Sequence, residues 1–386
     1  MAQVDDDILA AMVGWRHDFH AHPETAFTEV RTGDAVAAEL ARQGIAVHRG
    51  LAKTGVVGSL TNGPGPVIGL RADMDALFIE EKAAHPYVSQ HTGRMHACGH
   101  DGHTAMLLGA ARQLNRTRNF RGTVHFIFQP AEENEGGGRL MLEDGLFDRF
   151  PCSEVFGLHN WPSLPIGRFA INSATMMAAF DTFEITIRGR GCHGAMPESG
   201  IDPFIPAAQI MLGLQSIVSR RIGALENAVV SVTQIHGGDT WNVIPDSAVM
   251  RGTVRCMRPE VQDTIERHIR DIACGIARAH GADADVLYER RYPATINTPA
   301  SAGKAAAAAM AVVGSEAVAT DSPPSMASED FGYMLSRRPG AYIFMGVGDP
   351  LHQATLHNPH YDFNDAALET GAAFWVRLVE QVLVSG

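Results

Sequence analysis

The sequence predicts an α/β fold, a mixed sheet flanked by helices, with an inserted ferredoxin-like α+β domain. Short apolar runs that suit buried strands recur with helical patterns between them, which is typical of an α/β sheet. In the middle of the chain the strands instead alternate apolar and polar residues, which indicates a separate, half-solvated sheet. The length of 386 residues exceeds the usual size of one hydrophobic core and also favours two domains. We expect the α/β domain over residues 1–180 and 292–386 and the insertion over 181–291.

Composition and charge exclude several classes of protein. Hydrophobic residues make up 45% of the chain, enough for a full core, yet no run of about 18 apolar residues occurs. The formal net charge of -12 argues against nucleic acid or an anionic membrane as a partner, because both need a basic face. The N-terminus lacks the features of a signal peptide, and the five scattered cysteines suit a reducing compartment. We therefore expect a cytoplasmic protein.

The first residues predict a helix that ends near two histidines. Acidic residues 5–7 can cap a pattern of apolar residues that recur at helical spacing over residues 8–19. Pro23 then stops the helix. We expect His20 and His22 to be loop histidines at the helix end, although both could approach a site.

Four apolar runs that suit buried strands lead into polar side chains. The first three runs pass directly into them, and the fourth is followed by a glycine loop that begins at Gly346. In open α/β sheets ligands bind outside the carboxyl ends of the strands, so these side chains should converge. Each one alone would suit a solvated loop, but together they favour a metal site. The runs are 67–70, 123–128, 155–158 and 341–345, and the polar residues are Asp73, Asp75, Glu132, Glu133, His159, His357 and His360.

The middle of the chain predicts the element order β-α-β-β-α-β. This is the order of a split βαβ, ferredoxin-like unit. We expect its elements over residues 183–188, 203–221, 229–235, 248–257, 259–280 and 285–288. The α/β pattern resumes after Pro293 with an alanine-rich helix over residues 304–313, which is why the unit reads as an insertion.

The stretch His96–Thr104, His-Ala-Cys-Gly-His-Asp-Gly-His-Thr, predicts a metal-binding loop that leads into a helix. It sets a thiolate and an imidazole two positions apart, and Zn²⁺ binds both ligand types. Alone, these residues would equally suit a buried cysteine and surface histidines, so the strand ends decide. Five ligands from four segments are too many for one tetrahedral ion with an open position, so we expect two ions. The candidate ligands are Cys98, His100, one of Glu132 and Glu133, His159 and His357.

The adjacent Glu132 and Glu133 indicate acid–base chemistry beside the metal. In a strand-end turn they point in different directions, so one can bind metal while the other takes a proton from water. A metal lowers the pKa of bound water to about 7, so that proton is already loose. A pair of surface charges is the alternative, which the flanking Phe-Gln-Pro and Gly136-Gly-Gly disfavour.

The motifs of this chain together resemble the M20 family of metallopeptidases. The similarity is to its amidohydrolase branch, which includes hippurate hydrolase, aminoacylase-like enzymes and the plant hydrolases of auxin–amino acid conjugates. The motifs follow one another in order over essentially the whole chain. They are Arg71-Ala-Asp-Met-Asp-Ala-Leu, Met95-His-Ala-Cys-Gly-His-Asp-Gly-His, Gln129-Pro-Ala-Glu-Glu, Gly157-Leu-His-Asn, Gly189-Arg-Gly-Cys-His-Gly-Ala, Asn242-Val-Ile-Pro-Asp and Ser328-Glu-Asp-Phe.

The resemblance implies a dinuclear metal site and its reaction. The ions would be Zn²⁺ or Mn²⁺, with Co²⁺ or Ni²⁺ as alternatives, and Glu132 would be the general base. The reaction would be hydrolysis of the amide bond of an N-acyl or N-aroyl amino acid, which releases a carboxylic acid and a free amino acid. The implied metal ligands are Cys98, His100, Glu133, His159 and His357.

The resemblance also implies roles for the inserted domain. This domain would build a homodimer or homotetramer and cover the cleft as a lid. His193 would reach a neighbouring subunit's active site and stabilise the oxyanion. Asn242 and Arg255 would hold the substrate's carboxylate or carbonyl, and the Gly346 loop would meet a substrate carboxylate. For Arg255, a turn or a surface ion pair is the alternative.

One motif departs from other branches of the family. Those branches begin their metal ligands with His-x-Asp, where this chain reads Asp73-Met74-Asp75. We expect Asp75 to orient a metal ligand through a hydrogen bond, and the role of Asp73 is open.

Two other functions fit the same sequence. A dipeptidase or carboxypeptidase would keep the fold and change the substrate. A non-catalytic binding protein would keep only the scaffold, and the loss of a ligand or of Glu132 would favour it. All of these residues are present.

Overall fold

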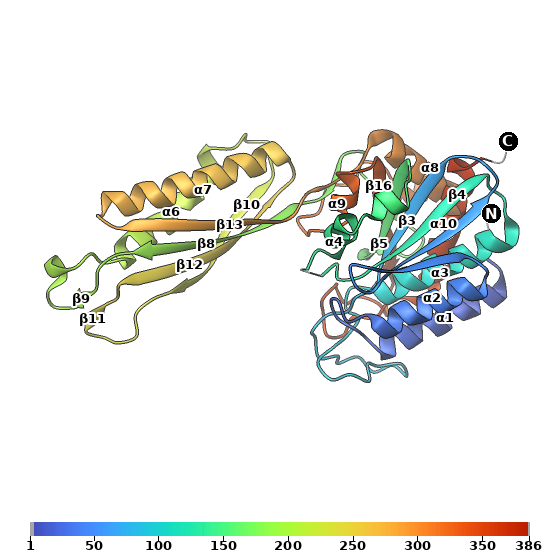
Figure 1. Cartoon of the computed structure of the whole chain (residues 1–386), viewed down its shortest axis with the longest axis horizontal. Helices are drawn as coiled ribbons and strands as arrows, with labels where there is room; N and C mark the ends of the chain where they lie inside the picture. Colours follow the sequence, from blue (N-terminus) through green and yellow to red (C-terminus); the bar gives the residue numbers. More distant parts are fainter. Residues whose placement is uncertain (1–3, 134, 385–386) are drawn as a thin grey trace. The chain divides into compact units, whose positions relative to one another are not determined.

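The computed structural model describes residues 4–133 and 135–384, which group into two compact units. The second unit contains Met177–Thr295 and Ser325–Glu329, and the first unit contains the described residues on either side. The predicted fold class is confirmed, since a mixed sheet with flanking helices forms the first unit and a separate antiparallel sheet forms the second (Figure 1). The predicted domain boundaries, after residues 180 and 291, stay a prediction.

The first unit is built on an eight-stranded mixed sheet. In spatial order its strands are β1 (Ala46–Leu51), β2 (Gly55–Asn62), β4 (Gly122–Gln129), β3 (Val67–Asp73), β5 (Glu154–Pro165), β16 (Gly340–Gly348), β6 (Phe169–Ala170) and β15 (Val318–Ala319). β3 pairs in parallel with β4 and with β5, and β5 pairs in parallel with β16. β1, β2 and β4 pair antiparallel. Almost every residue of β3 and β4 is buried, which explains why these strands read as continuous apolar runs.

Helices flank this sheet (Figure 1). They are α1 (Asp6–Ala21), α2 (Val30–Arg42), α3 (His100–Thr117), α4 (Gly137–Glu143), α5 (Leu146–Arg149), α8 (Pro299–Val313), α9 (Gly332–Leu335) and α10 (Leu368–Val382). α3 packs between α1 and α10, and α10 also packs against α8. Most of α3 is buried, so its first turn is held firmly in the unit. Across residues 4–133 and 135–384, we find no helix with the length and apolar content that a membrane crossing needs.

All four predicted apolar runs lie in strands, and each strand extends beyond its run, β5 and β16 the furthest. β5 continues through His159 to Pro165, and β16 includes Gly346–Gly348, where we predicted a loop. The loop prediction is wrong because these glycines serve strand pairing. Gly346 lies opposite Trp161, and a Cβ atom on it would lie 2.0 Å from the carbonyl oxygen of Pro165. Glycine therefore permits a close approach of two backbones here.

The prediction that His20 is a loop histidine is also wrong. α1 extends through Ala21, so His20 lies in its last turn and is fully buried. Its Nδ1–H donates to the Asp101 carboxylate of α3 at 2.8 Å, which gives the ring a buried partner that the local sequence does not reveal. His22 lies just after the helix, as expected.

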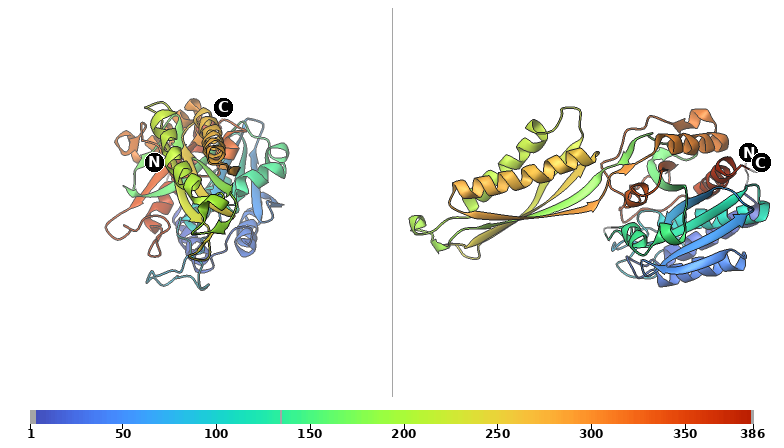
Figure 2. Two further views of the ribbon diagram at one scale, coloured as in Figure 1. Left: turned by 90° about the vertical axis from the view of Figure 1, so that its left-hand side faces the viewer. Right: turned by 45° about the horizontal axis from the view of Figure 1, so that its top comes forward.

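The second unit has the predicted ferredoxin-like element order. Its main elements are β8 (Ala179–Arg188), α6 (Phe204–Arg220), β10 (Ala228–His236), β12 (Ser247–Cys256), α7 (Pro259–Ala279) and β13 (Asp283–Tyr292). The sheet order is β10-β12-β8-β13, and all its pairs are antiparallel. In the right-hand view of Figure 2, the green α6 and yellow α7 lie along the same face of this sheet. Their apolar residues and the inward residues of the strands form one core.

Two helix glycines offer a test of the α1–α3 contact. A Cβ atom on Gly109 of α3 would lie 2.1 Å from Sδ of Met12, whereas nothing lies within 4 Å of a Cβ on the exposed Gly14 of α1. We expect Gly109→Ala to lower the free energy of unfolding by about 1–3 kcal/mol, because Met12 must move inside a packed interface. Gly14→Ala should raise it by about 0.5–1 kcal/mol, because alanine favours the helix. Urea unfolding followed by circular dichroism measures both, and equal effects would contradict the contact.

Candidate metal centre

The carboxyl ends of parallel strands bring the predicted ligands together in the first unit. β3, β4 and β5 run parallel, so the turns that follow β3 and β4 lie at the same edge of the sheet. The metal-binding loop precedes α3, which packs against this sheet. The ligands come from the loop and first turn of α3 (Cys98, His100), the turn after β4 (Glu133), β5 (His159) and the segment after β16 (His357).

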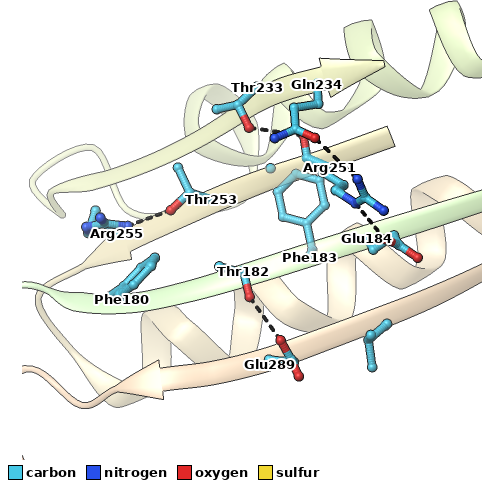
Figure 3. Close-up of a pocket in the computed structure, with 12 residues that line it drawn as sticks. Phe180, Thr182, Phe183, Glu184, Thr233, Gln234, Arg251, Thr253, Arg255 and Glu289 are labelled. Atoms are coloured by element: carbon cyan, nitrogen blue, oxygen red, sulfur yellow. Dashed lines mark hydrogen bonds and ion pairs between the residues drawn. The ribbon is translucent and has the colours of Figure 1, made fainter. Parts of the chain in front are cut away.

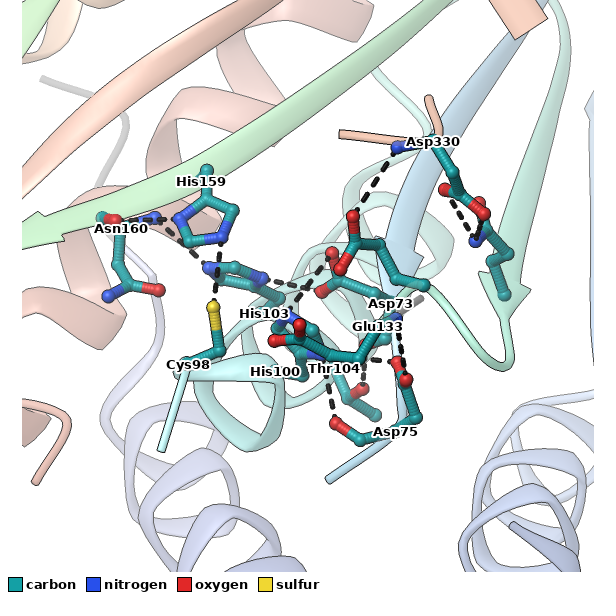
Figure 4. A network of polar contacts seen from close by, with 12 residues as sticks. Asp73, Asp75, Cys98, His100, His103, Thr104, Glu133, His159, Asn160 and Asp330 are labelled. Atoms are coloured by element: carbon teal, nitrogen blue, oxygen red, sulfur yellow. Dashed lines mark hydrogen bonds and ion pairs between the residues drawn. The ribbon is translucent and has the colours of Figure 1, made fainter. Parts of the chain in front are cut away.

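The five predicted ligands form two overlapping groups. In each group the ligand atoms lie within 4.8 Å of one another, and both groups include Cys98. Sγ of Cys98 lies 3.5 Å from Nε2 of His159, as Figure 4 shows, and Nε2 of His357 lies 3.1 Å from Oε1 of Glu133. The groups are Cys98, His100 and His159, and Cys98, Glu133 and His357. Two groups that share one ligand can hold two neighbouring cations.

Two of the histidines are held by one ring nitrogen and present the other. Nδ1–H of His100 donates to the backbone oxygen of Asp75 at 2.9 Å and lies 3.2 Å from its Oδ1. Nε2 of His100 is buried and has no hydrogen-bond partner among the described residues. Nδ1–H of His159 donates to the backbone oxygen of Asn160 at 2.7 Å, so its Nε2 faces Cys98. Metal-binding histidines are oriented in this way.

The electrostatics of the cluster also fit a divalent metal. Burial raises the pKa of the Cys98 thiol well above its ordinary value, and the carboxylates of Glu133, Glu132 and Asp73 raise it further. Burial alone would lower the pKa of His100, but nearby carboxylates, chiefly Asp73, outweigh it and raise the pKa to about 10. Negative charge therefore predominates around the Cys98 thiol and around Nε2 of His100. A bound cation is what would favour the thiolate there.

Asp75 contacts two of the ligands. Besides His100, it binds the turn after β4, because its Oδ2 accepts the backbone N–H of Glu133 at 2.9 Å. Its side chain is buried, and Figure 4 shows it beside His100 and Glu133. These are the contacts that the predicted orienting role of Asp75 requires.

A buried polar network supports the same edge of the sheet. Arg71 donates to Oδ2 of Asp73 at 2.6 Å, to Oε1 of Gln129 at 2.9 Å and to Oδ1 of Asp330 at 3.0 Å. Asp73 also accepts Nδ1–H of His103 at 2.6 Å. Burial would raise the pKa of Asp73, but its cationic neighbours, His100 first and then Arg71, hold it well below the ordinary value. All of these residues lie in motifs of the resemblance, but the sequence assigned them no role. Gln129 and His103 share a motif with a predicted ligand, which was the available signal for those two.

The turn that carries Glu132 and Glu133 is held in an unusual backbone conformation. Ala131, just before them, has a φ of +54°, which is rare for a residue with a Cβ atom. Its backbone N–H donates to Oε1 of Glu29 at 2.9 Å, and Glu29 is fully buried. Burial and then Asp75 raise the pKa of Glu29 to about 7. Sequence reasoning missed Glu29 because nothing near it in the chain marks a site.

The predicted residues His193 and Asn242 lie in the second unit. They meet at a two-stranded antiparallel sheet formed by β9 (Cys192–His193) and β11 (Val243–Ile244), where the backbone oxygen of Asn242 accepts the N–H of Gly194 at 2.7 Å. Both side chains are exposed. Nδ1 of His193 accepts the N–H of Ala195 at 3.0 Å, which leaves Nε2 outward. Their roles in catalysis and substrate binding stay a prediction.

Arg255 and Gly346 have local partners of their own. Arg255 lies in β12, at a pocket of about 400 Å³ on the sheet of the second unit (Figure 3). Its guanidinium lies 4.1 Å from the ring centre of Phe180 and donates to Oγ1 of Thr253 at 2.6 Å. The N–H of Gly346 donates to the backbone oxygen of Arg168 at 2.8 Å, so this donor is not free for a substrate. Roles for Arg255 and Gly346 in substrate binding stay a prediction.

Comparison with known proteins gives one consistent result. A sequence model of peptidase family M20/M25/M40 matches residues 69–381. N-acetylcysteine deacetylase of Bacillus subtilis (strain 168) is 40% identical over 375 residues, which cover 96% of this chain and 97% of that protein. Hippurate hydrolase of Campylobacter jejuni is 39% identical over 369 residues, which cover 95% of each. The crystal structure of the Bacillus subtilis YXEP protein, described as a dinuclear metal binding peptidase from the M20 family, matches with a TM-score of 0.87, 36% identity and coverage of 98% of this chain and 99% of that one.

The double contact of Asp75 leads to a mutational prediction. Asp75→Asn should lower metal affinity by about 10–100-fold, because the amide no longer offers two anionic acceptors to His100 and Glu133. Competition with a coloured chelator measures this affinity. The control is Asp34→Asn, which removes an exposed ion pair with Arg49 and should leave metal affinity unchanged. Equal affinities for Asp75→Asn and the unmodified chain would contradict the orienting role.

Proposed function

The chain belongs to peptidase family M20/M25/M40 and is a hydrolase, and we propose that it cleaves the amide bond of N-acyl or N-aroyl amino acids. The products would be a carboxylic acid and a free amino acid. One observation carries the proposal: the five ligands form two groups that share Cys98, and the buried carboxylate of Glu132 lies beside His100 of the first group. This is an arrangement for activating water next to a polarised carbonyl.

We propose that two divalent cations, Zn²⁺ or Mn²⁺ with Co²⁺ or Ni²⁺ as alternatives, occupy the site. When bound, they supply Lewis acidity that polarises the acyl carbonyl and eases the ionisation of water. Two imidazoles with a thiolate suit a borderline-soft ion, and a carboxylate with an imidazole suits harder ions as well. The proposed ligands are Cys98, His100, Glu133, His159 and His357.

The chain's own residues would move the proton and hold the charge. Glu132 would take the proton of the attacking water and pass it to the departing amine. Its side chain is buried, and its Oε1 lies 3.3 Å from the backbone nitrogen of Asp330, which fixes its position. Both glutamates place an oxygen near His100, and Glu133 also groups with Cys98 and His357. We therefore assign Glu133 to the metal and Glu132 to the proton. His193 would stabilise the oxyanion in a neighbouring subunit, and Asn242 and Arg255 would hold the substrate.

The proposed substrate class follows from what two similar proteins have in common. Their names specify N-acetylcysteine and hippurate, whose acyl groups differ greatly in size. Both compounds contain an amide between an acyl group and an α-amino acid. We therefore propose this amide as the recognised unit, with the acyl group as the variable part.

We also propose that the chain forms a homodimer or homotetramer through its second unit. α6 exposes Ile205 and Leu212, which are 52% and 68% accessible to solvent. β10 is an edge strand of its sheet and exposes Val229 and Ile235. Apolar side chains grouped with an open strand edge are typical of an interface between copies.

The general base can be tested with one substitution. Glu132→Gln should lower kcat by about 10²–10⁴-fold, because the amide cannot accept the proton of water, while the number of bound metal ions stays unchanged. Turnover assays together with elemental analysis measure both quantities. Glu135→Gln, in the same loop and exposed, is the control and should retain normal kcat. Near-normal turnover by Glu132→Gln would rule out its role as base.

The substrate class can be tested with a matched pair of compounds. N-acetyl-methionine and glycyl-methionine differ mainly by the amino group on the acyl side. We expect kcat/KM for N-acetyl-methionine to be higher by about tenfold or more, and we expect hippurate to be cleaved as well. A preference for glycyl-methionine would favour a dipeptidase. A metal-loaded protein that cleaves none of these compounds would favour a binding protein.

A further inference from the structure

A second group of metal-ligand side chains, separate from the five ligands, joins α1 to the segment between β3 and α3. His20 comes from the last turn of α1, and Glu81 and His85 come from that segment, which has little regular structure. Their ligand atoms lie within 4.8 Å of one another. None of the three takes part in the proposed reaction. We propose that His20, Glu81 and His85 bind a further divalent cation of the zinc type.

The distances between the three side chains suit such an ion. Nε2 of His20 lies 3.1 Å from Oε1 of Glu81, and Nε2 of His85 lies 2.9 Å from the same oxygen. Ligand atoms in a tetrahedral zinc site with bonds of about 2.0–2.1 Å lie roughly 3.3 Å apart. Two imidazoles and one carboxylate would fill three positions and leave the fourth for water.

His20 is oriented as a metal ligand. Its Nδ1–H donates to Oδ2 of Asp101 at 2.8 Å, and Asp101 is itself held by Nε–H of Arg16 at 3.2 Å. His20, Asp101 and Arg16 are all fully or almost fully buried. A carboxylate on Nδ1 fixes the ring so that Nε2 faces Glu81, which is how proteins commonly position histidine ligands.

The ring of His85 is mostly buried and faces Glu81. Its side chain is 12% exposed, and neither nitrogen has a hydrogen-bond partner among the described residues. Nε2 is close to Oε1 of Glu81, but the two atoms are not aligned as in a hydrogen bond. This suits two ligand atoms that both face a metal ion. The ring stacks on Tyr87 at 4.0 Å, so it is held in this orientation. Nε2 pairs with Glu81 at 2.9 Å and lies 4.0 Å from Oδ1 of Asp362, and an ion held by His85 and Glu81 would take the place of this direct contact.

The charge around the group also favours a cation. The carboxylates of Glu81, Asp101, Asp362 and Asp365 lie on or near these side chains, and Arg16 is the cation that contacts three of them. A bound divalent ion would offset this negative charge directly. Such an ion would also tie the irregular segment to α1, because His20 belongs to α1 and the other two ligands belong to the segment. Within the segment, Oε2 of Glu81 accepts the N–H of Ser89 at 2.6 Å.

The experiment counts metal ions in the full chain and does not depend on the proposed reaction. The purified protein is stripped with a chelator, reloaded with Co²⁺, freed of unbound ions and analysed for cobalt per chain. We expect His85→Gln and Glu81→Gln each to bind one ion fewer than the unmodified protein. The thiolate-to-cobalt absorption, which requires a cysteine ligand, should stay unchanged in both, because the lost ion does not contact sulfur.

The control is His91→Gln, which alters an exposed histidine of the same segment and should leave the count unchanged. Circular dichroism of the stripped proteins establishes that each variant folds, and Glu81→Gln keeps an oxygen for Ser89 if His85→Gln does not fold. Equal cobalt counts for both folded variants and the unmodified protein would overturn the proposal. In that case protons on the two imidazoles, rather than a metal ion, balance Glu81.

Discussion

The carboxylate of Asp75 accepts the backbone N–H of Glu133 at 2.9 Å and lies 3.2 Å from Nδ1 of His100, so one side chain holds two candidate ligands. Asp75 follows β3 and Glu133 follows β4, and the parallel pairing of these strands brings the two turns together. The site therefore depends on strand register. A slip of one residue would turn every side chain of the strand to the opposite face and separate the two turns. Almost every residue of both strands is buried, so such a slip would disrupt the packing on both faces of the sheet.

The candidate metal centre places much charge in the interior of the first unit. The carboxylates of Asp73, Asp75 and Glu132 are buried there, and an unpaired buried charge costs several kcal/mol. Arg71 offsets part of this, because it pairs with both Asp73 and Asp330. The remaining negative charge faces the ligand groups, where divalent cations would offset it. Since the unfolded chain does not hold these ligands together, metal binding and folding stability should be coupled.

Residue type and local pattern were enough to propose Cys98, His100, His159 and His357 as ligands together with one of Glu132 and Glu133, whereas the choice of Glu133 came from the family resemblance. The fold class followed from periodicity in the same way. Arg71 and Asp330 are 259 residues apart in the chain, and their contact exists only in the folded structure. Glu29 and His20 are similar cases, because their buried partners come from distant segments. Gly346 was assigned to a loop because glycine marks both turns and close strand approach, and only the neighbouring strand distinguishes them.

His100 and Asp101 are consecutive residues in the first turn of α3. His100 belongs to the candidate metal centre, and Asp101 supports the second group, which consists of His20, Glu81 and His85. His100 presents Nε2 to the candidate metal centre, while Asp101 accepts the Nδ1–H of His20 from α1. In each group a buried carboxylate fixes Nδ1 of a histidine and directs its Nε2, since Asp75 does for His100 what Asp101 does for His20. A helix turn that is buried on almost every side moves as one piece. An ion at the second group would therefore act on the position of His100 through α3.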